Sequence, residues 1–201
     1  MEAIEKPDES SPTLASTTEH GATVAGRVTV KSKRRLPQTV LYIEPVDPVR
    51  RFQPPANEIV VSQRGAKFSP SLLVISVGQT VEFRNDENRP IEHNVFSRSP
   101  TAPFDLGLYR PGISKPVTFD KPGVVRLYCS IHRYMDGLIY VCPTPFFARV
   151  DDDGHYKIED VPAGEYYLKT WQQRQRYAEQ SKRILVQEDT LLNVDFELIR
   201  K

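Results

Sequence analysis

Residues 128–135 read YCSIHRYM. This stretch places Cys129, His132 and Met135 in the spacing Cys-x2-His-x2-Met, and a further histidine, His93, lies upstream within IEHNVF. These residue types are scarce, because the 201 residues include only two cysteines, two methionines and four histidines. One of the two methionines is the first residue, so the single internal methionine falls on the third position of the motif. The coincidence indicates a metal site.

A thiolate, two imidazoles and a weak, distant thioether form the ligand set of mononuclear blue-copper sites. Two other interpretations use the same residues. In one, the motif is a strand end that packs into a core, with the upstream histidine at the surface; in the other, it is part of a zinc site. Zinc usually takes four strong ligands, however, and methionine is a poor one. We therefore predict one copper ion per chain. The predicted ligands are His93, Cys129, His132 and Met135.

The second cysteine, Cys142, leaves a structural alternative open. Two cysteines permit one disulfide, which would join Cys129 to Cys142. That bridge would consume the thiolate that copper needs. We expect Cys142, within IYVCP, to be a small buried apolar residue instead.

The motif resembles that of the cupredoxin family (plastocyanins, azurins, amicyanins), and its short ligand loop looks most like that of amicyanin and pseudoazurin. The resemblance implies a copper protein in which Met135 is the axial ligand and the other three ligands are equatorial. It implies that Asn94 ties the two ligand loops together, where the alternative is an ordinary turn asparagine. It also implies that His132 lies near the surface as the exit for electrons.

The pattern along the chain predicts an all-β protein. From residue 57 to residue 141, short runs rich in valine, isoleucine and leucine are separated by turn residues, with no helical periodicity between them. The stretch FSP followed by VEFRN and HNV looks like the first half of a cupredoxin. We predict a Greek-key cupredoxin β-sandwich over residues 56–143.

A second small β-sandwich is predicted from the remaining sequence. The stretch DDDGHY and a second expected hairpin over residues 161–168 resemble a carboxypeptidase-regulatory-like, transthyretin-like domain, whose usual first strand with Gly-x-Val is supplied far upstream by Gly26 to Val28. We therefore expect residues 21–46 plus 144–201 to form this sandwich. The cupredoxin domain would be inserted in it, with simple tandem domains as the alternative, and residues 1–20 would be a flexible tail. The polar stretch WQQRQR from residue 171 is expected to be a loop or a single helical turn.

Other features carry no additional site. The acidic loop fails as an EF-hand, because aligning its glycine on Gly154 puts Arg149 where the first calcium ligand must be. His20 and His155 are expected to be solvated or packed at turns. The formal net charge of +1 gives no global reason to expect nucleic acid or an anionic membrane as partner. No apolar run reaches the length of a transmembrane helix, and the N-terminus does not read as a signal peptide, so a leader would have been removed from an exported form.

From about residue 26 to residue 198 the chain resembles a bacterial group of methylamine-utilisation-like or plastocyanin-like proteins, which implies a periplasmic copper protein. We expect a one-electron carrier, with copper delivery or storage without redox turnover as the alternative. We do not expect an enzyme, because multicopper oxidases and copper nitrite reductases need more histidines than four. The partner would be an acidic redox protein, such as a c-type cytochrome, attracted by Arg89, Arg98 and Arg133.

Overall fold

The computed structural model describes residues 21–31, 35–174 and 176–201, and every regular element in these ranges is a β-strand. The predicted all-β class is therefore confirmed. In the part of the chain that the structure describes, no helix could cross a membrane. The expected tail, His20 and residues 32–34 of the basic turn lie outside the described residues.

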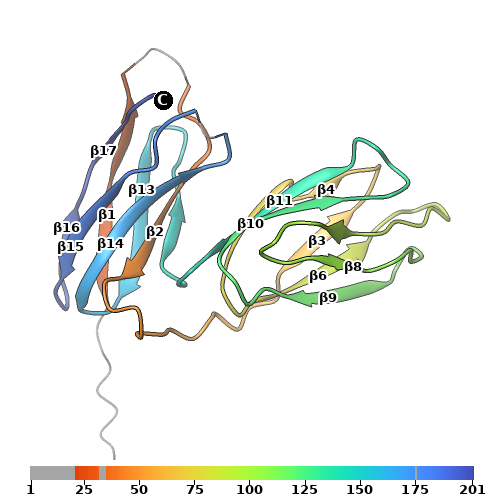
Figure 1. The fold of residues 1–201 in the computed structure, drawn as a ribbon, viewed down its shortest axis with the longest axis horizontal. Coiled ribbons are helices and arrows are strands. Elements are labelled where there is room, and N and C mark those ends of the chain that lie inside the picture. The colour runs from red at the N-terminus through yellow and green to blue at the C-terminus, as the bar shows by residue number, and fades with distance from the viewer. Residues whose placement is uncertain (1–20, 32–34, 175) are drawn as a thin grey trace, which may run out of the picture.

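One pair of sheets is built from both ends of the chain and lies on the left of Figure 1. Its first sheet contains β13 (His155–Val161), β1 (Ala22–Val30), β16 (Leu191–Asn193) and β17 (Phe196–Leu198). Its second sheet runs in the order β12 (Phe147–Arg149), β2 (Thr39–Pro45), β14 (Gly164–Gln172) and β15 (Ser181–Val186). One buried hydrophobic cluster draws on residues from both sheets, so they form one sandwich, which we call the outer sandwich.

The middle of the chain forms the second pair of sheets, on the right of Figure 1. One sheet runs in the order β5 (Leu72–Ser76), β11 (Asp136–Cys142), β10 (Gly123–Tyr128), β7 (Phe96–Ser97) and β8 (Phe104–Asp105). The other runs in the order β4 (Phe68–Ser69), β3 (Val60–Gln63), β6 (Thr80–Asn85) and β9 (Ser114–Thr118). A separate buried cluster fills the space between them, and we call this pair the central sandwich.

The two chain segments that form the outer sandwich, one before and one after the central sandwich, pair directly with each other. β1 is antiparallel to β13 and parallel to β16 and β17. β2 is antiparallel to both β12 and β14, so strands that precede and follow the central sandwich share one sheet. The division into residues 21–46 plus 144–201 and 56–143 as independent domains stays a prediction.

One local expectation is wrong, and a second is wrong for its first two residues. The expected hairpin over residues 161–168 is a crossing between sheets, because β13 pairs with β1 whereas β14 pairs with β2 and β15. The stretch that begins at Trp171 starts in a strand, because β14 continues to Gln172 and buries both side chains. Pairing with β2 and burial against the central sandwich outweigh the polar composition that follows.

An aromatic stack lies where the two sandwiches meet. Trp171 of β14 stacks on Tyr140 of β11 with ring centroids 4.1 Å apart and planes 9° apart. Tyr42 of β2 meets the edge of the same tyrosine at 5.7 Å. Leu72, Leu138 and other buried residues complete this apolar cluster, so the sandwiches share a dry contact as well as the chain connections.

Candidate metal centre

Three of the four predicted ligands come together at one end of the central sandwich. His93 Nδ1 lies 3.9 Å and His132 Nδ1 3.8 Å from Cys129 Sγ. The three candidate ligand atoms all lie within 4.8 Å of one another. An ion with metal–nitrogen distances of about 2.0 Å and a metal–sulfur distance of about 2.3 Å would hold a nitrogen and the sulfur roughly 3.6–3.8 Å apart. The donors therefore fit a shared metal ion without rearrangement of the backbone.

His93 is held by a backbone bridge to Tyr109. The histidine N–H donates to the tyrosine carbonyl at 3.2 Å, and the tyrosine N–H donates to the histidine carbonyl at 2.9 Å. The Tyr109 hydroxyl donates to the carbonyl of Phe83 at 3.1 Å, and Asn85 Nδ2 donates to the Tyr109 carbonyl at 3.0 Å. Burial raises the pKa of Tyr109 to about 12, so the hydroxyl keeps its proton as a donor. Strand β6, which carries Phe83 and Asn85, thereby positions the buried imidazole.

Asn94 joins the two segments that carry the donors. Its side-chain oxygen accepts hydrogen bonds from the Ser130 N–H at 2.7 Å and from the Ser130 hydroxyl at 2.9 Å. Its Nδ2 donates to Asp105 Oδ1 at 3.2 Å. The expectation that Asn94 ties the ligand loops together is confirmed. Since Ser130 follows Cys129 directly, these bonds fix the position of the sulfur relative to His93.

The segment after Cys129 turns back toward the core. The Met135 N–H donates to the His132 carbonyl at 2.9 Å, which closes a tight turn between these two residues. Met135 is only 2% exposed and packs in the same hydrophobic cluster as Cys129. His132 itself is half-buried, while its neighbour Ile131 is 50% exposed. The turn therefore buries the thioether beneath a histidine that reaches the surface.

Glu87 contacts the far side of the His93 ring, and no sequence pattern predicted this contact. Its Oε1 lies 3.0 Å from His93 Nε2 and accepts a bond from the Gly65 N–H at 2.6 Å. The hydrogen bond with His93 is the main cause that holds the pKa of Glu87 below its usual range. A carboxylate bound to the outer nitrogen of a histidine fixes the ring and makes the inner nitrogen a stronger ligand. Glu87 therefore leaves His93 Nδ1 directed toward Cys129.

Replacement of Glu87 by glutamine should weaken metal binding about 10-fold, because the His93 ring keeps a hydrogen-bond partner but loses the negative charge next to it.

The lowered pKa of Glu87 also means that its carboxylate stabilises the metal-free fold above the ordinary glutamate pKa. This contribution to stability disappears as the pH falls through the lowered value. Urea unfolding of the metal-free protein at about pH 6 and pH 3.5 should show a smaller loss in Glu87→Gln than in the unmodified protein. The control is Glu92→Gln, since this half-exposed carboxylate pairs with Arg110 at 3.6 Å. Equal metal affinity in both variants would contradict the role of Glu87.

The remaining candidates are separate from this cluster. Both cysteines are free, so the alternative disulfide is not formed, and Cys142 is fully buried as expected. Burial raises the pKa of the Cys142 thiol well above its ordinary value, which keeps it a neutral, apolar side chain. His155 is largely exposed, with its nearest acidic partner, Asp151, 3.9 Å away. Among the described residues, the group of three around Cys129 is the cluster of metal-binding side chains that the fold assembles.

Comparison with known proteins finds similarity only at the level of solved structures. No protein-family model matches the sequence, and no curated protein does. A purple cupredoxin from Nitrosopumilus maritimus is 27% identical over 42% of this chain and 99% of its own, with a TM-score of 0.38. A reduced amicyanin variant is 23% identical over 43% of this chain and 84% of its own, with a TM-score of 0.39. The copper-containing nitrite reductase of Thermus scotoductus SA-01 is 32% identical over 49% of this chain, with a TM-score of 0.41, and the chain spans 25% of its length.

Proposed function

We propose that the chain binds one copper ion and acts as a one-electron carrier. The observation that carries the proposal is the meeting of two imidazole nitrogens and a thiol sulfur at 3.8–3.9 Å in a site where Cys129 is 6% exposed. Met135, buried in the same cluster, would be the weak fourth ligand. A copper ion held by these ligands would gain and lose one electron, between Cu(I) and Cu(II), with little change in the positions of the ligands.

For this function, the protein must hold the ligand side chains in fixed positions. Tyr109 and Glu87 hold the buried His93, and Asn94 holds the segment that begins at Cys129. Side chains fixed by their own hydrogen bonds keep the same positions whichever charge the ion carries, so little reorganisation accompanies the gain or loss of an electron. The apolar cluster around Cys129 also keeps water away from the sulfur. These features support a carrier over a site that must open to release its ion.

The surface next to His132 supports a protein partner. Tyr134 is 88% exposed and Ile131 is half exposed beside the half-buried histidine, which gives an apolar contact at the proposed electron exit. Arg89, Arg98 and Arg133 are exposed and close in sequence to the candidate ligands. We propose that these arginines attract an acidic redox partner, such as a c-type cytochrome, to that contact. A periplasmic location is part of the proposal and rests on the sequence resemblance.

The test is electron transfer from the reduced copper protein to an acidic and to a basic cytochrome over a range of ionic strengths. We expect a rate with the acidic partner that falls as salt rises, because attraction between opposite charges is screened. The fall should be smaller in Arg133→Ala and unchanged in Lys121→Ala. Lys121 precedes β10, whereas Cys129 and His132 follow it, so this control charge lies about 20 Å from them along the strand.

Two outcomes would change the conclusion. A rate that does not depend on salt for either cytochrome would show that the arginines do not attract the partner. It would not contradict the carrier function. Rapid transfer of Cu(I) to a metal-free acceptor protein, with negligible electron exchange, would establish copper delivery or storage in place of electron transport.

A further inference from the structure

A hollow of about 730 Å³ lies between the two sandwiches, away from the candidate metal ligands. Ser71, which precedes β5 of the central sandwich, lines one side. Gln38, Arg149 and Gln173, which lie at the ends of β2, β12 and β14 in the outer sandwich, line the other. A volume of this size is within the range of small-molecule binding sites.

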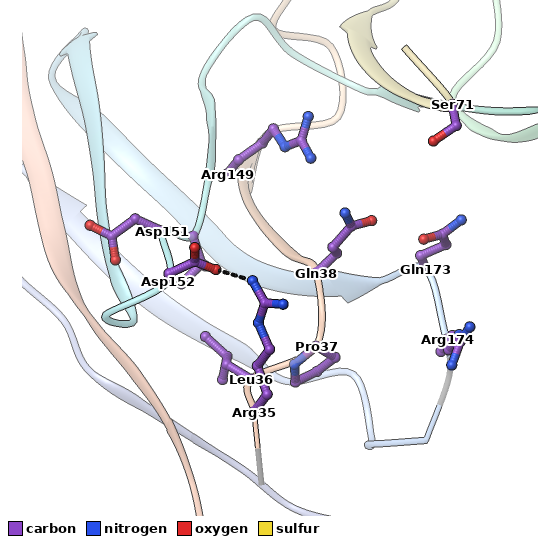
Figure 2. A pocket seen from close by; sticks show the side chains of 11 residues that line it. Arg35, Leu36, Pro37, Gln38, Ser71, Arg149, Asp151, Asp152, Gln173 and Arg174 are labelled. Carbon is purple, nitrogen blue, oxygen red and sulfur yellow. Dashed lines mark hydrogen bonds and ion pairs between the residues drawn. The ribbon is translucent and has the colours of Figure 1, made fainter. Parts of the chain in front are cut away.

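Four of the side chains around this hollow can donate hydrogen bonds. Figure 2 shows Arg149, Gln38, Gln173 and Ser71 arranged around the same space. Within the described residues, none of these four side chains makes a hydrogen bond or an ion pair. A guanidinium, two amide NH₂ groups and a hydroxyl are therefore free to bind a ligand from four directions.

The charge of the hollow favours anions. Arg35 donates to Asp152 at 2.8 Å, so this aspartate is already neutralised. Asp151 also lines the hollow, and its Oδ1 accepts bonds from the N–H groups of Asp153 and His155. Arg149 is left without an acidic partner among the described residues. The hollow thus presents uncompensated positive charge together with neutral donors.

The geometry points to a binding site for a small polyanion, and we propose that its ligand carries at least two phosphate or carboxylate groups. The planar guanidinium of arginine suits two oxygens of such a group, and amide and hydroxyl donors complete the remaining oxygen contacts. The hollow is larger than a single phosphate needs, which favours a ligand with several anionic groups. Because the walls of the hollow come from both sandwiches, the ligand would bind only when the two sandwiches are folded and in contact. Binding would therefore raise the unfolding temperature.

The experiment is calorimetric titration of the full chain, without added metal, at constant ionic strength in a phosphate-free buffer. The ligands are orthophosphate, pyrophosphate and citrate, so that phosphate and carboxylate sources are distinguished. We expect saturable 1:1 binding of pyrophosphate or citrate, at least 10-fold tighter than orthophosphate. Arg149→Ala should weaken this binding at least 10-fold, and Gln173→Ala about 3-fold.

The control is Arg51→Ala, an exposed arginine whose side chain donates to the carbonyls of Pro48 and Arg50. Its affinity should equal that of the unmodified protein. The same loss in Arg51→Ala as in Arg149→Ala would show general charge attraction and overturn the site. Absence of saturable binding for all three ligands would also overturn it. None of these outcomes depends on copper, so the test is independent of the proposed function.

Discussion

The Cys129→Ser variant should lose the intense sulfur-to-copper absorption band that the unmodified protein gains with one equivalent of Cu(II). Cys129 supplies the sulfur that lies 3.8–3.9 Å from both imidazole nitrogens, and a serine hydroxyl has no sulfur to give that transition. The same titration in His93→Ala should give a lost or altered band. Visible absorption and spin-resonance spectra measure both results.

Two further variants make this test specific. Cys142→Ala should keep the band, because Cys142 is buried in the contact between the sandwiches and contributes no ligand. Met135→Leu should also keep the colour, and it should raise the reduction potential, because loss of a weak donor destabilises Cu(II) more than Cu(I). A band that survives in Cys129→Ser, or a disulfide between Cys129 and Cys142 in the freshly purified protein, would refute the proposed site.

A fragment of residues 57–143 should fold by itself, whereas a fragment of residues 146–201 should not. The first contains both sheets of the central sandwich and their shared core, and a domain with its own core can fold alone. The second lacks β1 and β2, each of which lies between other strands of its sheet. Without them, β12 loses its antiparallel neighbour, and β13 is separated from the rest of its sheet.

Far-ultraviolet circular dichroism and cooperative urea unfolding of the two fragments provide the measurement. The 57–143 fragment should also bind Cu(II) with the colour of the full chain, at reduced stability because Trp171 no longer covers Tyr140. Independent, cooperative folding of the 146–201 fragment would favour tandem domains over an insertion. Failure of the 57–143 fragment to fold would show that the two sandwiches are one cooperative unit.

Local sequence predicted the metal centre where the donors lie close in the chain or are rare. Cys129 and His132 are three residues apart, and Met135 is the single internal methionine, so spacing and composition alone indicated the cluster. The contact of Asn94 with the segment after Cys129 was implied by the family resemblance, and not by the local sequence pattern. The strand segments followed from the alternation of apolar residues and the turn residues between them.

Contacts between distant segments could not be predicted in this way. Glu87 and His93 lie in the loop between β6 and β7, and Tyr109 lies in the loop between β8 and β9. No periodic pattern in the sequence relates these three positions. The stack of Trp171 on Tyr140 likewise depends on how the two sandwiches meet, and it is the reason that a polar-looking stretch begins in a buried strand. The hairpin expected at residues 161–168 failed because local turn residues do not specify which sheet the next strand joins.

The pairing of β2 with β12 has a consequence for the order of folding. Thr144 Oγ1 donates to the carbonyl of Ile43 at 2.5 Å across 101 residues, so this part of the outer sandwich closes a very long loop. The entropy cost of closure grows as (3/2)RT ln n, which is about 4 kcal/mol for a flexible chain of that length. If the central sandwich folds first, its two ends are held together, and only the short connections on either side remain to be closed. The central sandwich would then act as a template that speeds completion of the outer sandwich.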